Sequence, residues 1–363
     1  MRTDLLDYPL PDEAIAQHPA QRREDARLLV VREQSVEHRG LGEWVQLVPA
    51  GALVVLNDTR VRRARLSARK DTGGVVEVFF LSERLLPAGV REWTVLAQAN
   101  RPLRAGTRLE LGSARLTVLE RGSGPEICLR VDGVEDSEAF IERHGALPLP
   151  PYIRRAPRPE DAERYQTVFA EHLGSVAAPT AGLHLTHGML AELERREIRV
   201  ASVTLHVGAG TFLPVRAHDL DAHPMHAEHY SVSPALVDAV VAARARGAPV
   251  VAVGTTVVRA LESASDPERS GQLRAGSAQT RLLIQPGFPF RVVDALLTNF
   301  HAPRSTLLAL VSAFIGLGRC AEAYRAALAA GYRFLSYGDA MWLPARLLQD
   351  REAGSGRPAA ASS

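Results

Sequence analysis

The stretch Leu53-Val54-Val55-Leu56-Asn57-Asp58-Thr59-Arg60 holds the main clue to the fold. Its first four residues form a short apolar run, which is typical of a strand buried on both faces. Polar residues follow at once, and α/β proteins usually place ligand-binding side chains at this end of a strand. The sequence therefore predicts a buried strand that ends at a candidate ligand site. A second run of the same kind occupies residues 28–31.

The character of the sequence changes between Arg62 and Pro151. Short strand-like runs follow one another there, separated by clusters of Gly, Pro and Asn; they are residues 75–80, 93–96, 107–111, 115–119 and 127–131. A spacing of about 8–12 residues is typical of small all-β domains. We predict a β-barrel domain inserted over residues 62–151, with one helix at 137–143 and a stiff proline-rich exit.

From Ala178 onward, strand-like and helix-like patterns alternate. Predicted helices cover 189–196, 234–246, 255–263, 307–314 and 321–330, and predicted strands cover 199–206 and 249–253. This alternation favours an α/β fold, a helix-covered mixed sheet interrupted by the barrel. The expected domains are the α/β domain with the candidate site (1–61 and 152–350), the barrel (62–151) and a disordered tail (351–363).

Composition excludes several classes of protein. Charged residues make up 23% of the chain, and no apolar run is long enough to cross a membrane. The N-terminus carries Asp4 and Asp7 and does not look like a signal peptide, so we expect a cytoplasmic protein. Cys128 and Cys320 are too few for a four-thiolate zinc site or an iron–sulfur cluster. Lys70 is the only lysine, and no P-loop is present.

Histidines are concentrated in one block: eight of the twelve lie between His172 and His229. Glycines directly after a predicted strand let the backbone approach a ligand closely, and a histidine beside a carboxylate can act as an acid/base pair. The catalytic candidates in this block are His184, His206 and Glu228. The substrate-binding candidates beside them are Gly208, Gly210, Thr211 and His226. His172, His187 and His218 are interpreted as ordinary surface or core residues.

The same block offers an alternative, because His223, His226 and His229 are spaced by three and could line one face of a helix. Such a face would suit a metal ion. Pro224 lies inside the run and disfavours a helix there. Acid/base chemistry is therefore the preferred interpretation, with metal binding as the alternative.

Three further segments place polar groups at the ends of predicted elements. A strand runs into Gly254 and two threonines that open a helix, where free N–H groups attract an anion, although an ordinary threonine cap would look the same. The segment 298–305 brings an amide, an aromatic ring and an imidazole ahead of a helix, and 332–341 is rich in aromatic residues that stack on bases or fill a core. The candidates from these segments and from the opening stretch are Gly254, Thr255, Thr256, Arg259, Asn299, Phe300, His301, Tyr337, Asp339, Asp58 and Arg60.

Together these segments resemble the S-adenosylmethionine:tRNA ribosyltransferase-isomerase family of queuosine biosynthesis. The matching stretches are 56–60, 178–184, 203–214, 225–228, 253–262, 297–305 and 332–341. Residues 7–11 and 165–169 are similar as well, so the likeness extends to about Leu348. Each motif alone is weak, but their joint order is specific. Leu185 departs conservatively from the phenylalanine expected after the His184 motif.

The resemblance implies an α/β domain interrupted by a β-barrel, and an unusual reaction. The ribosyl part of S-adenosylmethionine is transferred and isomerised onto 7-aminomethyl-7-deazaguanine at the tRNA wobble position, giving epoxyqueuosine and releasing adenine and methionine. S-adenosylmethionine is then a consumed co-substrate, and no metal or redox cofactor is required. The expected partner is a tRNA carrying the modified base, with no membrane, and the protein is expected to be a monomer.

The resemblance also suggests roles. His184, His206 or Glu228 would remove the proton that the sulfonium acidifies, and His301 would protonate the departing adenine. The methionine carboxylate would suit the helix start at Gly254, Asp339 would face the sulfonium and Asp58 would read the guanine-like edge. Two rival classes stay open: a metal-dependent hydrolase built on the three spaced histidines, and a non-catalytic RNA-binding module.

Overall fold

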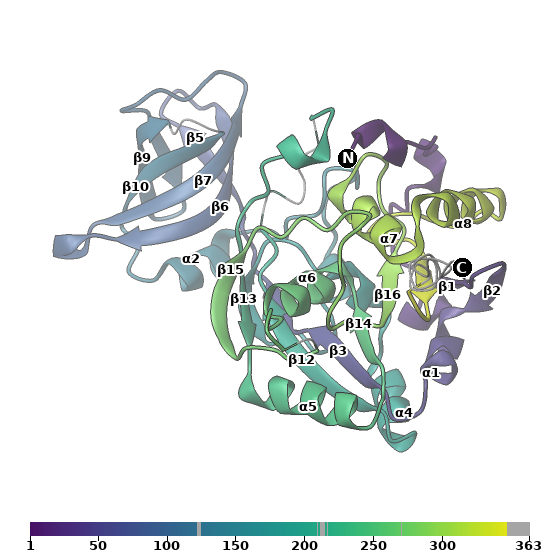
Figure 1. Cartoon of the computed structure of the whole chain (residues 1–363). Coiled ribbons are helices and arrows are strands. Elements are labelled where there is room, and N and C mark those ends of the chain that lie inside the picture. Colours follow the sequence, from purple (N-terminus) through teal and green to yellow (C-terminus); the bar gives the residue numbers. More distant parts are fainter. Residues whose placement is uncertain (122–124, 209, 211–214, 216, 270, 347–363) are drawn as a thin grey trace, which may run out of the picture.

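The centre of the molecule is a nine-stranded mixed sheet in the order β15-β13-β12-β3-β14-β16-β17-β1-β2 (Figure 1). The computed structural model describes residues 1–121, 125–208, 210, 215, 217–269 and 271–346. The strands are β1 Arg27–Val31, β2 Val36–Gly40, β3 Leu53–Asn57, β12 Arg199–Leu205, β13 Glu228–Val232, β14 Val250–Val253, β15 Gly276–Thr280, β16 Ala295–Asn299 and β17 Ala340–Leu343.

Four neighbouring strands at the centre, β12, β3, β14 and β16, run parallel to one another. In β3 and β14 every residue is buried, which explains their continuous apolar runs. Because parallel strands share a direction, the carboxyl ends of all four meet at one edge of the sheet. Asn57 and Asn299 end two of these strands at that edge. The candidate site lies there.

Helices cover both faces of the sheet. The one face packs against α5 Pro234–Ala245, α6 Thr255–Ser263, α7 Thr306–Ile315 and α8 Leu317–Ala329. The other packs against α1 Trp44–Leu47 and α4 His187–Arg195. Strand β3 serves both layers, since Leu53 and Val55 belong to the first core and Val54 and Leu56 to the second. The α/β part is therefore a three-layer fold.

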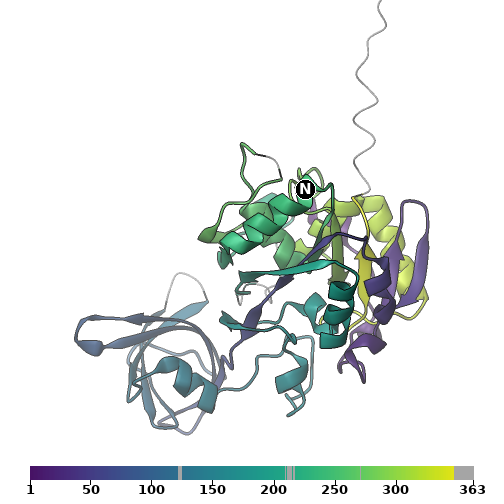
Figure 2. The ribbon, with the colours of Figure 1, turned by 90° about the horizontal axis from the view of Figure 1, so that it is seen from below.

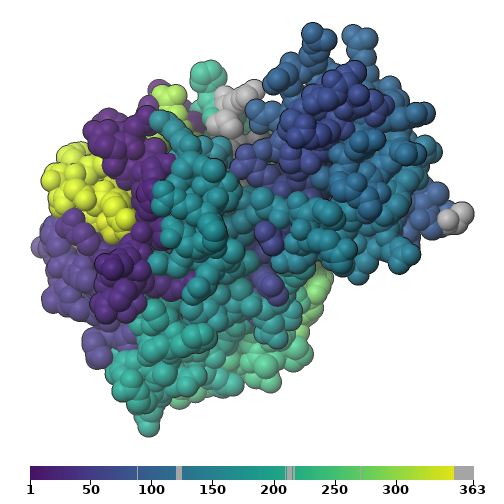
Figure 3. Space-filling model, turned by 180° about the vertical axis from the view of Figure 1, so that it is seen from behind, coloured from purple at the N-terminus to yellow at the C-terminus, as the bar shows by residue number. Residues whose placement is uncertain are grey.

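The inserted segment forms a closed six-stranded barrel in the order β10-β7-β6-β5-β8-β9. Its strands are β5 Arg65–Lys70, β6 Val75–Leu85, β7 Arg91–Ala99, β8 Arg108–Leu111, β9 Ala114–Arg121 and β10 Glu126–Asp132, followed by α2 Ser137–His144. Alternate residues such as Val76, Val78 and Phe80 fill a separate core. The barrel stands apart from the main sheet as a lobe of its own in all three views (Figures 1, 2 and 3).

The junction between the two lobes is a short parallel ribbon of β4 Thr59–Val61 and β11 His172–Ser175. The remaining elements are short: α3 Asp161–Arg164 and the 3₁₀ turns Thr3–Leu6, Asp12–Ala14, Arg23–Asp25, Leu41–Glu43, Pro87–Gly89, Thr180–His184 and Leu220–Ala222. In the described part of the chain no single helix is long and apolar enough to cross a membrane. Only α7 and α8 together reach that length and composition, across a bend of 111°.

The predicted fold class, a helix-covered mixed sheet with an inserted β-barrel, is confirmed. The strands that the prediction missed include the edge strand β15, whose residues are polar and mostly exposed, and β13 beside it, whose residues are mostly polar; they also include β16, although all five of its residues are buried. Of the aromatic segment 332–341, residues 340 and 341 belong to β17. Residues 332–339 are turns before β17, and Leu335 adopts a positive φ of 69°. The predicted tail 351–363 lies outside the described residues.

Candidate active site

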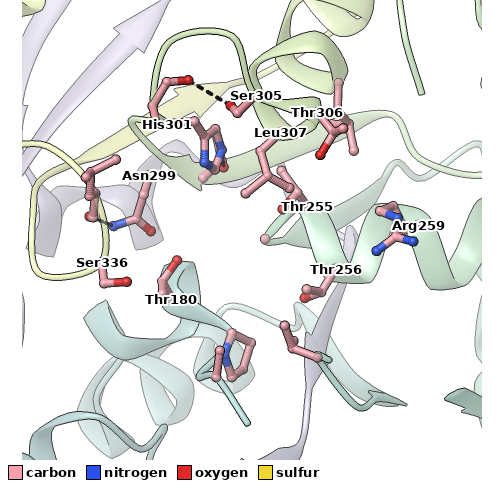
Figure 4. A pocket seen from close by; sticks show the side chains of 18 of the residues that line it. Thr180, Thr255, Thr256, Arg259, Asn299, His301, Ser305, Thr306, Leu307 and Ser336 are labelled. Atoms are coloured by element: carbon pink, nitrogen blue, oxygen red, sulfur yellow. Dashed lines mark hydrogen bonds between the residues drawn. The ribbon is translucent and has the colours of Figure 1, made fainter. Parts of the chain in front are cut away.

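A cavity of about 480 Å³ opens where β14 and β16 end, and its size suits a small-molecule ligand (Figure 4). Residues from many segments line it, including the turn after β11, the loop after β12, the starts of α6 and α7 and the segment before β17. The predicted candidates among the lining residues are Gly210, His226, Glu228, Gly254, Thr255, Thr256, Arg259, Asn299, Phe300 and His301.

Two helices begin at this cavity. Helix α6 starts after Gly254, whose φ of 97° favours glycine, and no side chain caps its first turn. The Asn57 side chain donates to Thr256 Oγ1 at 3.2 Å and so ties the end of β3 to this helix start. Helix α7 starts after Ser305, which accepts from the Leu308 N–H at 3.1 Å. The uncapped N–H groups of α6 make this end of the cavity favourable for an anion.

A buried ion pair joins Glu228 on β13 to Arg259 on α6. One Glu228 oxygen accepts from Arg259 Nη1, and the other accepts from the Gly208 N–H at 3.1 Å. Arg259 also donates to the Leu282 carbonyl at 3.0 Å. Its remaining nitrogen, Nη2, is buried without a partner among the described residues. The wall of the cavity therefore carries, at Arg259, a guanidinium with an unused donor beside the Glu228 carboxylate.

Two glycines in the loop after β12, Gly208 and Gly210, support the side of the cavity that Glu228 and His226 line. Gly208 uses its N–H to hold Glu228. A Cβ built on Gly210 would lie 2.4 Å from the His226 ring, so glycine is needed there to make room for that ring. The sequence suggested that these glycines approach a ligand; Gly210 does line the cavity, and in addition the two glycines position Glu228 and His226. Thr211 lies outside the described residues.

Asn299 ends β16 and is 1% exposed. Its Nδ2 donates to the Leu335 carbonyl at 3.1 Å and approaches His184 Nε2 at 3.2 Å. His184 does not line the main cavity but lies behind Asn299 at a second, much smaller pocket. Burial, with smaller contributions from Arg333 and Arg23, lowers the pKa of His184 to about 4. The imidazole is therefore neutral near pH 7.

His301 lines the cavity, and its Nε2 lies 2.9 Å from Thr298 Oγ1. Its backbone N–H donates to the Tyr324 hydroxyl at 3.0 Å. Burial lowers the pKa of His301 to about 4 as well. The ring is thus held in place and is neutral near pH 7.

Three predicted residues lie at the junction between the lobes instead of in the cavity. His206 Nδ1 is 2.8 Å from Thr59 Oγ1, and burial lowers the pKa of this half-buried histidine. Asp58 accepts from the Thr204 hydroxyl at 2.7 Å, and burial raises its pKa. Arg60 is exposed on β4. These residues are in position to contact a ligand bound between the two lobes.

Three other predicted residues make contacts within the protein that stabilise the fold. Phe300 lines the cavity but packs within a buried aromatic cluster, where the centroid of its ring lies 4.8 Å from that of Phe334. The Tyr337 hydroxyl donates to buried Asp161 at 2.7 Å. Asp339 accepts the backbone N–H groups of Arg27 and Arg333 at 2.9 and 2.8 Å, and it does not line the cavity. The expectation that Asp339 faces a bound sulfonium is therefore corrected: it holds the chain around β17.

The three spaced histidines of the metal alternative do not converge. His223 and His226 line the cavity, whereas His229 lies on β13 with its Nε2 2.8 Å from the Gln279 amide. Among the described residues, one group has ligand atoms close enough for a metal ion, and it consists of Asp58, Glu171 and His172 at the junction. The sequence alternative therefore has no geometric support in the described part of the chain.

Sequence reasoning missed several polar residues of the cavity, among them Thr180, Ser305, Thr306 and Ser336. Thr180 lies within the stretch 178–184 that contains His184, and Ser305 ends the predicted 298–305 segment, so helix-start reasoning could have found Ser305 and Thr306. No local signal marks Ser336. It reaches the cavity because the turn at Leu335 packs against the end of β16, where the Leu335 N–H donates to the Phe300 carbonyl at 3.1 Å.

Comparisons with known proteins agree over almost the whole chain. The profile of the family described as "Queuosine biosynthesis protein" matches residues 3–343. The S-adenosylmethionine:tRNA ribosyltransferase-isomerase of Sorangium cellulosum is 51% identical, covering 94% of this chain and 98% of that protein. The protein of that name from Aromatoleum aromaticum is 50% identical, covering 94% and 97%. A crystal structure of S-adenosylmethionine tRNA ribosyltransferase from Thermotoga maritima is 33% identical, covers 93% and 99%, and has a TM-score of 0.52.

Proposed function

The chain belongs to the family of queuosine biosynthesis proteins, and from this we propose that it is an S-adenosylmethionine:tRNA ribosyltransferase-isomerase. It transfers and isomerises the ribosyl moiety of S-adenosylmethionine onto 7-aminomethyl-7-deazaguanine at the tRNA wobble position. The products are epoxyqueuosine-tRNA, adenine and methionine. The observation that carries this conclusion is the 51% identity over nearly the full length of both this chain and its relatives.

The cavity is the proposed site of S-adenosylmethionine. Its charged end offers the uncapped start of α6 and the unused Nη2 donor of Arg259, which together suit the methionine carboxylate. Glu228 stands beside them and offers negative charge to the ammonium or the sulfonium. Asn57 supports this end by holding Thr256.

Glu228 is the proposed general base. The sulfonium acidifies the adjacent ribose 5′ C–H, and a carboxylate placed beside it can take that proton to give an ylide. Of the three candidates for the base, Glu228 lines the cavity, whereas His184 lies behind Asn299 and His206 lies at the junction. Arg259 and the Gly208 N–H fix the orientation of the carboxylate.

His301 is the proposed proton donor to the departing adenine. Its ring lines the cavity and is held by Thr298. Burial keeps it neutral in the free protein, so this role requires that negatively charged bound tRNA raises its pKa. Asp58 and Arg60 lie at the junction, and we assign them to contacts with the tRNA, where Asp58 would accept from the ring N–H groups of the guanine-like base.

The remaining proposals concern conditions of action. S-adenosylmethionine is consumed as co-substrate, and the chemistry described needs no metal or redox cofactor. We expect a cytoplasmic monomer that contacts no membrane. Unchanged turnover after treatment with a chelator would support the metal-free proposal, and a loss restored by added metal would contradict it.

The test of the proposed function is direct. The protein is incubated with S-adenosylmethionine and tRNA that carries the aminomethyl base, and adenine release and the mass of the wobble nucleoside are measured. Release of one adenine per epoxyqueuosine formed is expected. Tight, salt-sensitive tRNA binding without consumption of S-adenosylmethionine would instead indicate a non-catalytic RNA-binding protein.

A further inference from the structure

The Asn299 amide has one buried atom that the protein leaves unused. Its Nδ2 group makes two contacts, with the Leu335 carbonyl and with His184 Nε2. Its Oδ1 is buried and accepts no hydrogen bond from any described residue. Buried carbonyl oxygens normally find a donor, because leaving one without a partner is costly. Asn299 lines the cavity, so a ligand in that cavity can supply the missing donor.

The orientation of this amide is set by its neighbours. The Leu335 carbonyl can only accept a hydrogen bond, so the atom facing it must be the NH₂ group and not the oxygen. Leu335 itself is held in a positive φ of 69°, with its carbonyl also accepting from the Gly338 N–H at 3.0 Å. His184 takes the second N–H through Nε2, which requires the neutral ring that its lowered pKa provides. Oδ1 is thereby presented as a fixed acceptor.

This acceptor lies across the cavity from Arg259. In Figure 4, Asn299, Ser336 and Thr180 lie on one side and Arg259 lies on the other, with Thr255 and Thr256 between them. Among the described residues that line the cavity, Glu228 is the acidic one, and it is paired with Arg259. A zwitterionic amino acid group is therefore drawn to the Arg259 end, and the neutral base of the same ligand is left for the Asn299 end.

We propose that Asn299 Oδ1 accepts a hydrogen bond from the exocyclic amino group of the adenine of S-adenosylmethionine, and that His184 is a positioning residue that fixes the Asn299 amide. The inference rests on the proposed function and deepens it. It makes Asn299 a specificity-determining residue for an amino-substituted purine. It also moves His184 from the acid/base chemistry to the support of base recognition.

The 6-oxo analogue of S-adenosylmethionine tests this contact. It carries an oxygen where adenine carries the amino group, so a carbonyl acceptor would face Oδ1 and repel it. We measure kcat/KM for base release with each donor and the same tRNA, and express selectivity as their ratio. A site built to pair with a donor rejects an analogue that lacks it strongly, so a ratio of about 100 or more is expected for the unmodified protein.

Variants locate the source of the selectivity. Asn299→Ala should lower the ratio to below about 10, since the repelling carbonyl is gone. Asn57→Ala is the matched control, because Asn57 is also a buried amide at the end of a central strand, but both of its polar atoms have partners. It should reduce the ratio less than about twofold, whatever it does to stability. A ratio is insensitive to a loss of folded protein, which lowers both rates equally.

His184 is tested by replacement and rescue. His184→Gln places an acceptor where Nε2 stands and should keep the ratio within about threefold, whereas His184→Leu should lower it about tenfold. A pH–rate profile that loses a limb in His184→Gln, with turnover lowered 100-fold or more, would make His184 the base and overturn its positioning role.

The two proposals fail separately. If the unmodified protein releases no adenine from S-adenosylmethionine, the proposed function is wrong. If it does so and uses the 6-oxo analogue equally well, the function stands and the role of Asn299 is wrong. Selectivity that survives in Asn299→Ala would likewise contradict the Asn299 contact alone.

Discussion

Glu228 and Arg259 form an ion pair whose two side chains are only 7% and 9% exposed, at the wall of the cavity. Glu228 begins the antiparallel strand β13, and Arg259 lies one turn into α6, the helix that starts at the cavity. The pair therefore connects the sheet to the helix start. It also fixes a carboxylate and an unused guanidinium donor beside one another.

Glu228→Gln should abolish most of the turnover while leaving the cavity intact. The amide can still accept from Gly208, but it cannot take a proton. We expect kcat for adenine release to fall on the order of 100-fold or more, with KM for S-adenosylmethionine changed less than about tenfold. Steady-state kinetics with His206→Gln as the comparison will check this, since His206 should lose less than about tenfold. The opposite order would assign the proton transfer to His206.

Arg259→Met should destabilise the fold, because it leaves the Glu228 carboxylate buried without its partner. The expected decrease in the free energy of unfolding is about 3–5 kcal/mol, measured by urea denaturation. The double variant with Glu228→Gln should recover a large part of this loss, since no uncompensated charge remains. Equal stability of the single variant and the unmodified protein would mean that the pair is open to solvent.

Gly210→Ala should impair activity through His226. The added Cβ would meet the ring of His226 at 2.4 Å, so the ring must leave its position on the cavity wall. We expect kcat/KM to fall on the order of 10- to 100-fold, with the free energy of unfolding changed by less than about 1 kcal/mol. Gly318→Ala, where a Cβ meets no atom within 4 Å, is the control and should retain activity. A Gly210→Ala protein with full activity would remove His226 from the site.

The stability of the protein should fall as the pH decreases from 7 to 5. His184 and His301 have pKa values lowered to about 4 by burial, well below the ordinary histidine value of about 6.5. The unfolded chain therefore binds protons in this range that the folded protein does not, which favours unfolding at the lower pH. Each histidine should contribute about 2 kcal/mol to the decrease between pH 7 and pH 5.

Urea denaturation at the two pH values will measure this effect. His184→Gln should remove about half of the contribution of the pair, because glutamine does not titrate. His187→Gln changes an exposed histidine at the start of α4 and should leave the pH dependence unaltered. An unchanged pH dependence in His184→Gln would mean that folding does not lower the pKa of this ring.

The layers of the fold could be predicted from the sequence because they depend on local patterns. Strand β3 reads as an apolar run because both of its faces are covered, and α6 begins and ends where the sequence indicates, at Thr255 and Ser263. The barrel strands alternate between inside and outside, which the short runs reveal. The edge strand β15 escaped prediction because four of its five residues are exposed, and β13, which lies between β15 and β12, escaped because its mostly polar residues form no apolar run.

The location of the site was also predictable in outline. The opening stretch 53–60 predicted polar groups at the end of a buried strand, and the cavity lies at that edge of the sheet. The polar residue of the stretch that supports the cavity proved to be Asn57, through Thr256. Asp58 and Arg60 point the other way, toward the junction with the barrel, because successive residues of an extended chain face opposite sides.

By itself, the sequence determined the elements, their layers, the insertion of the barrel and the residue types available for chemistry. Only the tertiary structure decided which of those residues share a cavity. Glu228 and Asn299 share the cavity. His184 does not line it, but it contacts Asn299 from behind, across a separation of 115 positions in the chain. The physical reason is that periodicity reports only neighbours along the chain, while contacts across the sheet depend on strand order, register and the packing of turns such as that at Leu335.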